Sequence, residues 1–371
     1  MRLKKGEFDN SNTFQFTALR GIQAGREYYI VMCPLRLIPR MFLFNELEIP
    51  PRLRAQRKLN KARIPEMASY ITQNNMDYTF SSLTASIDGN VEFIPMKKEG
   101  HFSKMGILKV PMNSRFLIND GQHRRAAIEH ALEQKPELAM ETISVVFYLD
   151  KGLRKSQQMF SDLNKHAVRP STSLNILYDH RDSFSEALRS IINEIPIFAN
   201  DLTELEKTSI SNRAHKVFTL NSIYNSTKDF LGKKEKKPTI TEKEKNLVKE
   251  YWNQVYHNIK QWQDVVNGKV SPYDLRKEYV HVYGIVLHSL GRMGNELIQK
   301  YPKSWKSKLS AINNINWKRT NVKAWEGRSM ISGRLSKMRT NIVLTTNFLK
   351  NKVGLKLSKE ENKLEKNLRK R

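Results

Sequence analysis

The segment from Ile118 to Arg125 concentrates the side chains most able to do chemistry. It reads Ile-Asn-Asp-Gly-Gln-His-Arg-Arg, after an apolar, strand-like run and before a helix-like run. Free backbone N–H groups at a helix N-terminus and two adjacent guanidinium groups would together form a corner that binds phosphate. Gly121 would let the backbone turn sharply or approach a ligand closely. The candidate anion-binding residues are Asp120, Gly121, Gln122, His123, Arg124 and Arg125.

The same residues also have a plainer interpretation. Asp-Gly is a common turn pair, His123 could be a half-buried residue, and the two arginines could form a solvated face. Asp120 would repel a phosphate unless a cation or an arginine lies between them. It could therefore cap the helix, hold Arg124 in place or bind Mg²⁺, and the sequence leaves these alternatives open.

The pentapeptide from Asp120 to Arg124 resembles the motif that names the DGQHR group, which is related to the ParB/sulfiredoxin-like superfamily. In ParB-type proteins, a Gly-Glu-Arg-Arg turn between a strand and a helix binds nucleotide phosphates. Gly121, Arg124 and Arg125 match that turn, whereas Gln122 and His123 depart from it. The resemblance implies a nucleotide-dependent switch that binds CTP or ATP with Mg²⁺, without a required cofactor. It gives less support to NTPase activity.

Two other segments would complete such a nucleotide site. Residues 52–63 hold six basic residues, and in the ParB analogy the residues just before a helix predicted at 62–71 face the nucleotide. Residues 160–170 form a polar, turn-rich stretch. The plainer alternatives are a charged loop and a capped helix end before Pro170. The further candidate nucleotide-binding residues are Asn60, Arg63, Asn164, Lys165 and Arg169.

Several ordered blocks of the sequence resemble the corresponding blocks of DndB proteins. These blocks are residues 19–29, 32–37, 54–65 and 160–170, and the resemblance covers most of the chain. It implies a transcriptional repressor of a DNA phosphorothioation gene cluster, which restrains sulfur modification while other proteins perform the sulfur chemistry. The implied partners are double-stranded DNA at the promoter of its own operon and other phosphorothioation proteins. A homodimer would suit a palindromic operator.

The charge of the chain independently favours a polyanionic partner. The formal net charge is +27 and the pI is near 10.0. From Lys303 to Arg371 there are 19 Lys and Arg against 4 Asp and Glu, so +15 of this charge lies near the C-terminus. Such a balance is typical of nucleic-acid binding. The candidate DNA-binding residues are Arg54, Arg57, Lys58, Lys61, Lys306, Lys308, Lys318, Arg319, Lys323, Arg328, Arg334, Lys337 and Arg339.

Three tryptophans, Trp305, Trp317 and Trp325, lie among these basic residues. They could stack on bases, or they could anchor the core of a helical bundle whose outer face is basic. We favour the second arrangement, with the tryptophans inside and the Lys and Arg side chains facing DNA. A helix-turn-helix bend at residues 329–337 is a weaker expectation.

The single cysteine, Cys33, excludes an intrachain disulfide and a metal centre built only from cysteines of one chain. Cys33 is expected to be a small buried apolar residue, with a redox-responsive thiol near Arg36 as the alternative. The nine histidines show no metallohydrolase spacing, so no metal site is predicted. A nuclease remains a low-ranked alternative, because it would need Mg²⁺ at Asp120 or Asp162 without a dense acidic cluster.

The sequence shows no apolar run of about 18 residues, which predicts no membrane-spanning helix. The polar N-terminus lacks the apolar stretch of a secretory signal, so we expect a cytoplasmic protein.

The elements that must position the Ile118–Arg125 segment indicate an α+β fold. Short strands are predicted at 14–16, 28–32, 108–110, 116–118 and 143–148, with a hairpin of 83–87 and 91–94 across Asp88-Gly89-Asn90. A helix is predicted from Arg125 to Glu133. We expect a ParB-like domain with a mixed sheet at residues 1–155, a helical connecting region that completes the core at 156–232, and a basic helical domain with a frayed tail at 233–371. Thr241 is a candidate N-cap in the last domain.

Overall fold

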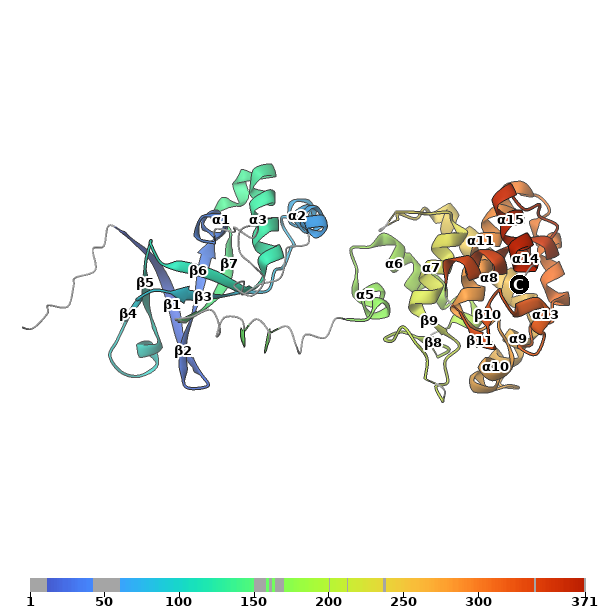
Figure 1. Cartoon of the computed structure of the whole chain (residues 1–371), viewed down its shortest axis with the longest axis horizontal. Coiled ribbons are helices and arrows are strands. Elements are labelled where there is room, and N and C mark those ends of the chain that lie inside the picture. The colour runs from blue at the N-terminus through green and yellow to red at the C-terminus, as the bar shows by residue number, and fades with distance from the viewer. Residues whose placement is uncertain are drawn as a thin grey trace, which may run out of the picture. The chain divides into compact units, whose positions relative to one another are not determined.

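The computed structural model describes residues 12–42, 61–149, 158–159, 162–163, 170–199, 201–211, 213–235, 238–336 and 338–369. The chain divides into two compact units, Met1–Val168 and Arg169–Arg371. The first unit combines a large sheet with helices and the second is mainly helical, which confirms the predicted α+β class (Figure 1).

The N-terminal unit is built on a seven-stranded sheet in the order β4-β5-β1-β2-β7-β3-β6. Its strands are β1 (Thr13–Gln23), β2 (Arg26–Pro34), β3 (Leu83–Asp88), β4 (Glu92–Pro95), β5 (Met105–Pro111), β6 (Arg115–Asp120) and β7 (Thr142–Leu149). Neighbouring strands are antiparallel except β3 and β7, which are parallel, so the sheet is mixed as predicted.

The helices of this unit lie together on one face of the sheet (Figure 1). They are α1 (Ile38–Met41), α2 (Ile64–Gln73) and α3 (Gln122–Gln134), with short 3-10 turns η2 (Leu35–Leu37), η4 (Lys61–Arg63), η5 (His101–Lys104) and η6 (Pro136–Met140). Alternate strand residues such as Phe16, Val31 and Phe147 point into this core and are buried. The alternation leaves large apolar side chains such as Leu19 and Ile107 exposed on the strands.

The predicted hairpin of residues 83–87 and 91–94 is wrong. β3 pairs with β6 and β7, whereas β4 pairs with β5 near the opposite edge of the sheet. A two-residue Asp-Gly hairpin turn needs positive φ at its glycine, and Gly89 is not among the glycines with positive φ. The chain therefore leaves β3 without reversing, and β4 pairs with a later strand.

The C-terminal unit packs its helices around one hydrophobic core. They are α5 (Thr172–Tyr178), α6 (Ser183–Ile192), α7 (Leu220–Phe230), α8 (Glu242–His257), α9 (Lys260–Val266), α10 (Pro272–Glu278), α11 (Gly284–Lys300), α12 (Trp305–Leu309), α13 (Val322–Trp325), α14 (Arg339–Lys352) and α15 (Lys359–Arg369). Short elements complete the unit: η7 (Pro196–Phe198), η8 (Ser310–Asn314), β8 (Thr203–Glu204), β9 (Phe218–Thr219), β10 (Met330–Ile331) and β11 (Arg334–Leu335). Trp252 and Trp262 lie fully buried in this core.

The start of α8 and the C-terminal helix α15 can be compared with the sequence predictions. Thr241 caps α8 as predicted: its hydroxyl accepts a hydrogen bond from Glu244 N, and the Glu244 carboxylate accepts one from Thr241 N. The tail differs from the frayed end that the sequence predicted, because residues up to Arg369 form α15 and Glu365 is buried against Arg328.

Candidate functional site

The Asp-Gly-Gln-His-Arg motif forms the junction between β6 and α3. β6 ends at Asp120, Gly121 has a φ of 105°, and α3 begins at Gln122. A Cβ atom at position 121 would lie 2.3 Å from Leu83 Cδ2, so glycine is required both by conformation and by space. α3 begins three residues earlier than predicted, which places Gln122, His123 and Arg124 in its first turn, where backbone N–H groups lack acceptors within the helix.

Arg124 is held at this junction by two side chains. Its Nη2 lies 2.6 Å from Asp120 Oδ2, and its Nη1 donates a hydrogen bond to Ser81 Oγ in the loop before β3. Of the three roles open to Asp120, the structure therefore shows that of holding Arg124. The ion pair also places a positive group beside the carboxylate that would otherwise repel an anion.

Arg125 points away from Arg124 into the protein. Its guanidinium forms an ion pair with Glu129 and donates a hydrogen bond to Pro39 O at 3.2 Å. Consecutive side chains on a helix diverge by about 100°, so the two guanidinium groups do not share one corner as the sequence suggested. Arg125 is 8% exposed and fastens α3 to α1.

The junction also holds buried polar atoms without a hydrogen-bond partner among the described residues. They are Asn119 Oδ1, Gln122 Nε2, Arg124 Nε and Arg125 Nε. Asn119 is fully buried and Gln122 is 7% exposed. Because buried polar atoms are nearly always paired, Gln122 Nε2 and Arg124 Nε are available donors in the first turn of α3. With the backbone N–H groups of that turn, they suit the oxygens of a phosphate or carboxylate.

The segments predicted to complete the nucleotide site are described only in part. Lys61 and Arg63 lie in η4, exposed, just before α2, which packs against α3. Met159 Sδ lies 3.0 Å from Asn119 Nδ2, and Asp162 accepts a hydrogen bond from Gln158 Nε2 at 2.7 Å. The remaining candidates of these segments lie outside the described residues: Arg54, Arg57, Lys58, Asn60, Asn164, Lys165 and Arg169.

The three C-terminal tryptophans are buried, as predicted. Trp305 is 5% exposed, Trp317 is 3% exposed and Trp325 is fully buried. Trp317 and Trp325 stack with ring centroids 5.4 Å apart. These rings are therefore part of the core.

Four of the candidate DNA-binding residues make contacts within the protein. Arg328 forms a two-pronged ion pair with Glu365, with both N–O distances at 2.6 Å. Lys306 pairs with Glu250, and Lys308 Nζ lies 4.2 Å from the centroid of the Tyr301 ring. Arg319 donates to Gly333 O at 3.0 Å. The Arg328 side chain is only 13% exposed, and its ion pair stabilises the packing of α15.

Four other candidates remain exposed in the C-terminal unit, and none of them forms an ion pair with a described residue. They are Lys318, Lys323, Arg334 and Arg339. Lys337 lies outside the described residues. Lys318 and Lys323 flank the start of α13, Arg334 lies in β11, and Arg339 begins α14.

Residues 330–335 form a small hairpin rather than the helix-turn-helix bend that we expected. β10 and β11 are antiparallel, and the turn between them has positive φ at Ser332 and Gly333. The Glu326 carboxylate accepts hydrogen bonds from the backbone N–H groups of both turn residues. This anchor fixes the hairpin that carries Arg334.

Cys33 is fully buried in the core of the N-terminal unit. Burial raises the pKa of its thiol to about 12, so the reactive thiolate is disfavoured at neutral pH. Arg36 lies near Met140 instead, with Arg36 Nη1 at 3.0 Å from Met140 Sδ. The structure supports the packing role of Cys33 over the redox alternative.

Two functional side chains escaped the sequence analysis. Ser81 accepts a hydrogen bond from Arg124, and the neighbouring Ser82 Oγ lies 2.6 Å from Ser144 Oγ on β7. Ser81 thus connects the loop before β3 to α3, and Ser82 connects it to the sheet. Consecutive serines before a strand were the only sequence feature that pointed to them.

Within the described ranges, no three His, Cys, Asp or Glu side chains are grouped so that they could hold a metal ion. In the same part of the chain, every helix is too short or too polar to cross a membrane.

Comparison with known proteins gives one match. The model of the DndB family, described as DNA-sulfur modification-associated, matches residues 16–356. No curated protein and no solved structure matches the chain. The family match covers the β6–α3 junction and the four exposed candidates Lys318, Lys323, Arg334 and Arg339. The chain belongs to the DndB family of DNA-sulfur modification-associated proteins.

Proposed function

We propose that this protein is a DNA-binding repressor that restrains expression of a DNA sulfur modification gene cluster. The observation that carries the proposal is the exposure of four basic residues, Lys318, Lys323, Arg334 and Arg339, which we propose act together and call the basic surface. These side chains are exposed and make no ion pair with a described residue, while Trp317 and Trp325, which lie close to them in sequence, are buried. The cations are therefore available to phosphates, and base stacking by those tryptophans is not required.

Binding through such a surface is governed mainly by release of counterions from DNA. Each phosphate that a Lys or Arg neutralises adds about one unit to the slope of log affinity against log salt. Phosphate contacts position a protein on DNA without reading its sequence, so selectivity for the cluster's own promoter requires further contacts. Other proteins of the modification system are additional proposed partners.

A salt-series titration tests this function. The full chain would be titrated with the promoter fragment of its own cluster and with an unrelated duplex of the same length. We expect tighter binding to the promoter, and the quadruple charge reversal K318E/K323E/R334E/R339E should weaken binding to both duplexes and flatten the salt dependence. The quadruple reversal K207E/K260E/K269E/K277E, at exposed positions outside the basic surface, is the matched control because it changes the net charge equally. Equal binding by the basic-surface variant and the control would refute the assignment of the surface, and equal affinity for both duplexes would refute promoter selectivity.

A second candidate function is a nucleotide-dependent switch at the β6–α3 junction. It is favoured by Gln122 Nε2 and Arg124 Nε, two buried donors without a partner among the described residues, beside the N-terminus of α3. CTP or ATP with Mg²⁺ would place a phosphate against these donors. Calorimetric titration of each nucleotide into wild type and Gln122→Leu distinguishes this function. Wild-type binding that the variant loses supports it, and heats that are equal or absent in both proteins contradict it.

A further inference from the structure

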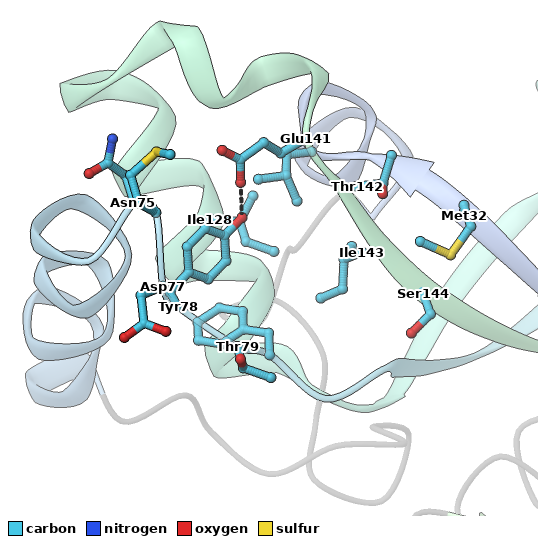
Figure 2. A pocket seen from close by; sticks show the side chains of 13 residues that line it. Met32, Asn75, Asp77, Tyr78, Thr79, Ile128, Glu141, Thr142, Ile143 and Ser144 are labelled. Atoms are coloured by element: carbon cyan, nitrogen blue, oxygen red, sulfur yellow. Dashed lines mark hydrogen bonds between the residues drawn. The ribbon is translucent and has the colours of Figure 1, made fainter. Parts of the chain in front are cut away.

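A pocket of about 680 Å³ is lined by the loop that connects α2 to β3 and by the start of β7 (Figure 2). This loop contributes Asn75 to Phe80. Glu141, which follows η6, and Thr142 to Ser144 of β7 also line the pocket. Ser82, which follows the loop, is joined to Ser144, while Ser81 is joined to Arg124. The pocket is therefore distinct from the anion site, and its volume is in the range of small-molecule sites.

The pocket wall combines apolar and acidic side chains. Met32, Phe80 and Ile143 are among its apolar members, and Asp77 and Glu141 are its charged members. Of the described residues that line it, none is Lys, Arg or His. The charge of the pocket lining is therefore negative, whereas the net charge of the whole chain is +27. The lining is therefore complementary to a cation that also carries apolar surface.

The acidic wall is held in place by the fold. Leu35 N donates a hydrogen bond to Glu141 O at 2.8 Å, which fixes the backbone between η6 and β7. The Tyr78 hydroxyl donates to Glu141 Oε2, as Figure 2 shows. Burial, and next the bond to Glu141, raise the pKa of Tyr78 well above its ordinary value, so the phenol remains a neutral donor. The pair thus presents a carboxylate at a defined position.

The opening of the pocket carries exposed methionines. Met76 is 92% exposed and Met32 is 58% exposed, although both side chains line the pocket. Methionine is flexible and polarizable, and exposed methionines are typical of surfaces that close over flexible apolar ligands. A bound methylene chain would cover the apolar surface of these methionines, and removing that surface from water is favourable.

We propose that this pocket binds a free aliphatic diamine or polyamine, with its ammonium groups at Asp77 and Glu141 and its methylene chain along the apolar wall. The aromatic rings of Tyr78 and Phe80 favour a nearby cation. General electrostatic attraction cannot produce such binding, because the protein repels cations at long range. Saturable binding of a diamine therefore reports the local site.

A matched pair of ligands tests the role of charge. The full chain, freed of nucleic acid, would be titrated calorimetrically with 1,8-octanediamine, with 1,8-octanediol and with spermidine. We expect saturable binding of the diamine and spermidine but not of the diol, which has the same chain without the charges. Equal binding of diamine and diol, or no diamine binding at millimolar concentration, would overturn the proposal.

Matched variants locate the ligand. Glu141→Gln keeps an oxygen that accepts the Tyr78 hydroxyl, and Asp77→Asn removes the charge of an exposed residue with almost no change in its size. Each should weaken diamine affinity on the order of tenfold, since each removes one charge-assisted hydrogen bond. Glu137→Gln, an exposed position in η6 that does not line the pocket, should leave it unchanged. Unchanged affinity in both pocket variants would refute the site.

Discussion

Arg124 Nη2 lies 2.6 Å from Asp120 Oδ2, so the last residue of β6 and the first turn of α3 are joined by an ion pair across Gly121. Arg124 also donates to Ser81, which leaves its Nε buried without a partner among the described residues. The junction is therefore organised around Arg124 alone, and substitutions of Arg124 and Arg125 should have different effects.

Gly121→Ala should destabilise the protein by about 2 kcal/mol, because the added methyl group meets Leu83 Cδ2 and the backbone has a φ of 105°. Gly25→Ala is the control, because Gly25 has a φ of 74° with nothing within 4 Å of an added Cβ. Its cost should be limited to about 1 kcal/mol of backbone strain. Urea unfolding of both variants measures the difference, and equal losses would argue against the steric constraint at Gly121.

Arg124→Ala and Arg125→Ala should have different consequences. The Asp120 side chain of the Arg124–Asp120 ion pair is half-exposed, so loss of the pair should cost about 1 kcal/mol of stability at most. Arg124→Ala should nevertheless remove nucleotide binding. Arg125 is 8% exposed and bonds both Glu129 and Pro39, so its loss should cost about 1–3 kcal/mol. Urea unfolding and nucleotide titration of both variants separate these effects. The assignment fails if Arg124→Ala unfolds more readily than Arg125→Ala.

Arg328→Ala should destabilise the C-terminal unit by about 3 kcal/mol, because it leaves Glu365 buried without its partner. Arg334→Ala, on the exposed β11, should change stability by less than about 0.5 kcal/mol but weaken DNA binding. Thermal unfolding together with DNA titration distinguishes the two roles. A stable Arg328→Ala variant with weakened DNA binding would contradict the structural role of Arg328.

His281 should make the protein less stable in mild acid. It is fully buried, and burial lowers its pKa to about 3, whereas the unfolded chain has an ordinary pKa of about 6.5. Between these values the unfolded state binds more protons, so the free energy of unfolding falls as the pH falls below about 6.5. The contribution of this histidine between pH 7 and pH 5 is about 2 kcal/mol.

His281→Gln tests this dependence, because glutamine retains an acceptor for the Trp262 Nε1–H group, which lies 3.0 Å from His281 Nδ1. The loss of stability between pH 7 and pH 5, measured by urea unfolding, should be about 2 kcal/mol smaller than in wild type. His257→Gln, at an exposed position, should retain the full wild-type loss. The same loss in wild type and His281→Gln would exclude His281 as the source.

Cys33 should resist alkylation in the folded protein. Its thiol is fully buried and its pKa is raised to about 12, so both access and thiolate formation are limited. Iodoacetamide at pH 8 should label Cys33 only in urea, at a rate that follows unfolding. Rapid labelling without denaturant would revive the redox interpretation.

Local patterns determined much of the fold. The alternation of apolar residues predicted β2 and β7, and the spacing of Ile64, Met67, Ala68 and Ile71 predicted α2. Thr241 was identified as a cap because its hydroxyl bonds a backbone group only three residues away. The same sequence pattern did not determine strand pairing, because β4 could form a hairpin with β3 or pair with the later β5, and only the turn at Gly89 and the packing of the whole sheet select the second.

The sequence by itself determined which residue types meet at the β6–α3 junction and that basic residues gather near the C-terminus, and it favoured a core role for the tryptophans among them. Only the tertiary structure decided which of those charges face solvent. Arg125 and Arg328 carry the same charge as the exposed Arg334, yet Glu129, Pro39 and Glu365 engage the first two inside the protein. Whether an arginine is buried or faces solvent depends on residues that are distant in sequence, such as Pro39, which lies 86 residues from Arg125. Local spacing does not encode which distant group a buried charge will contact.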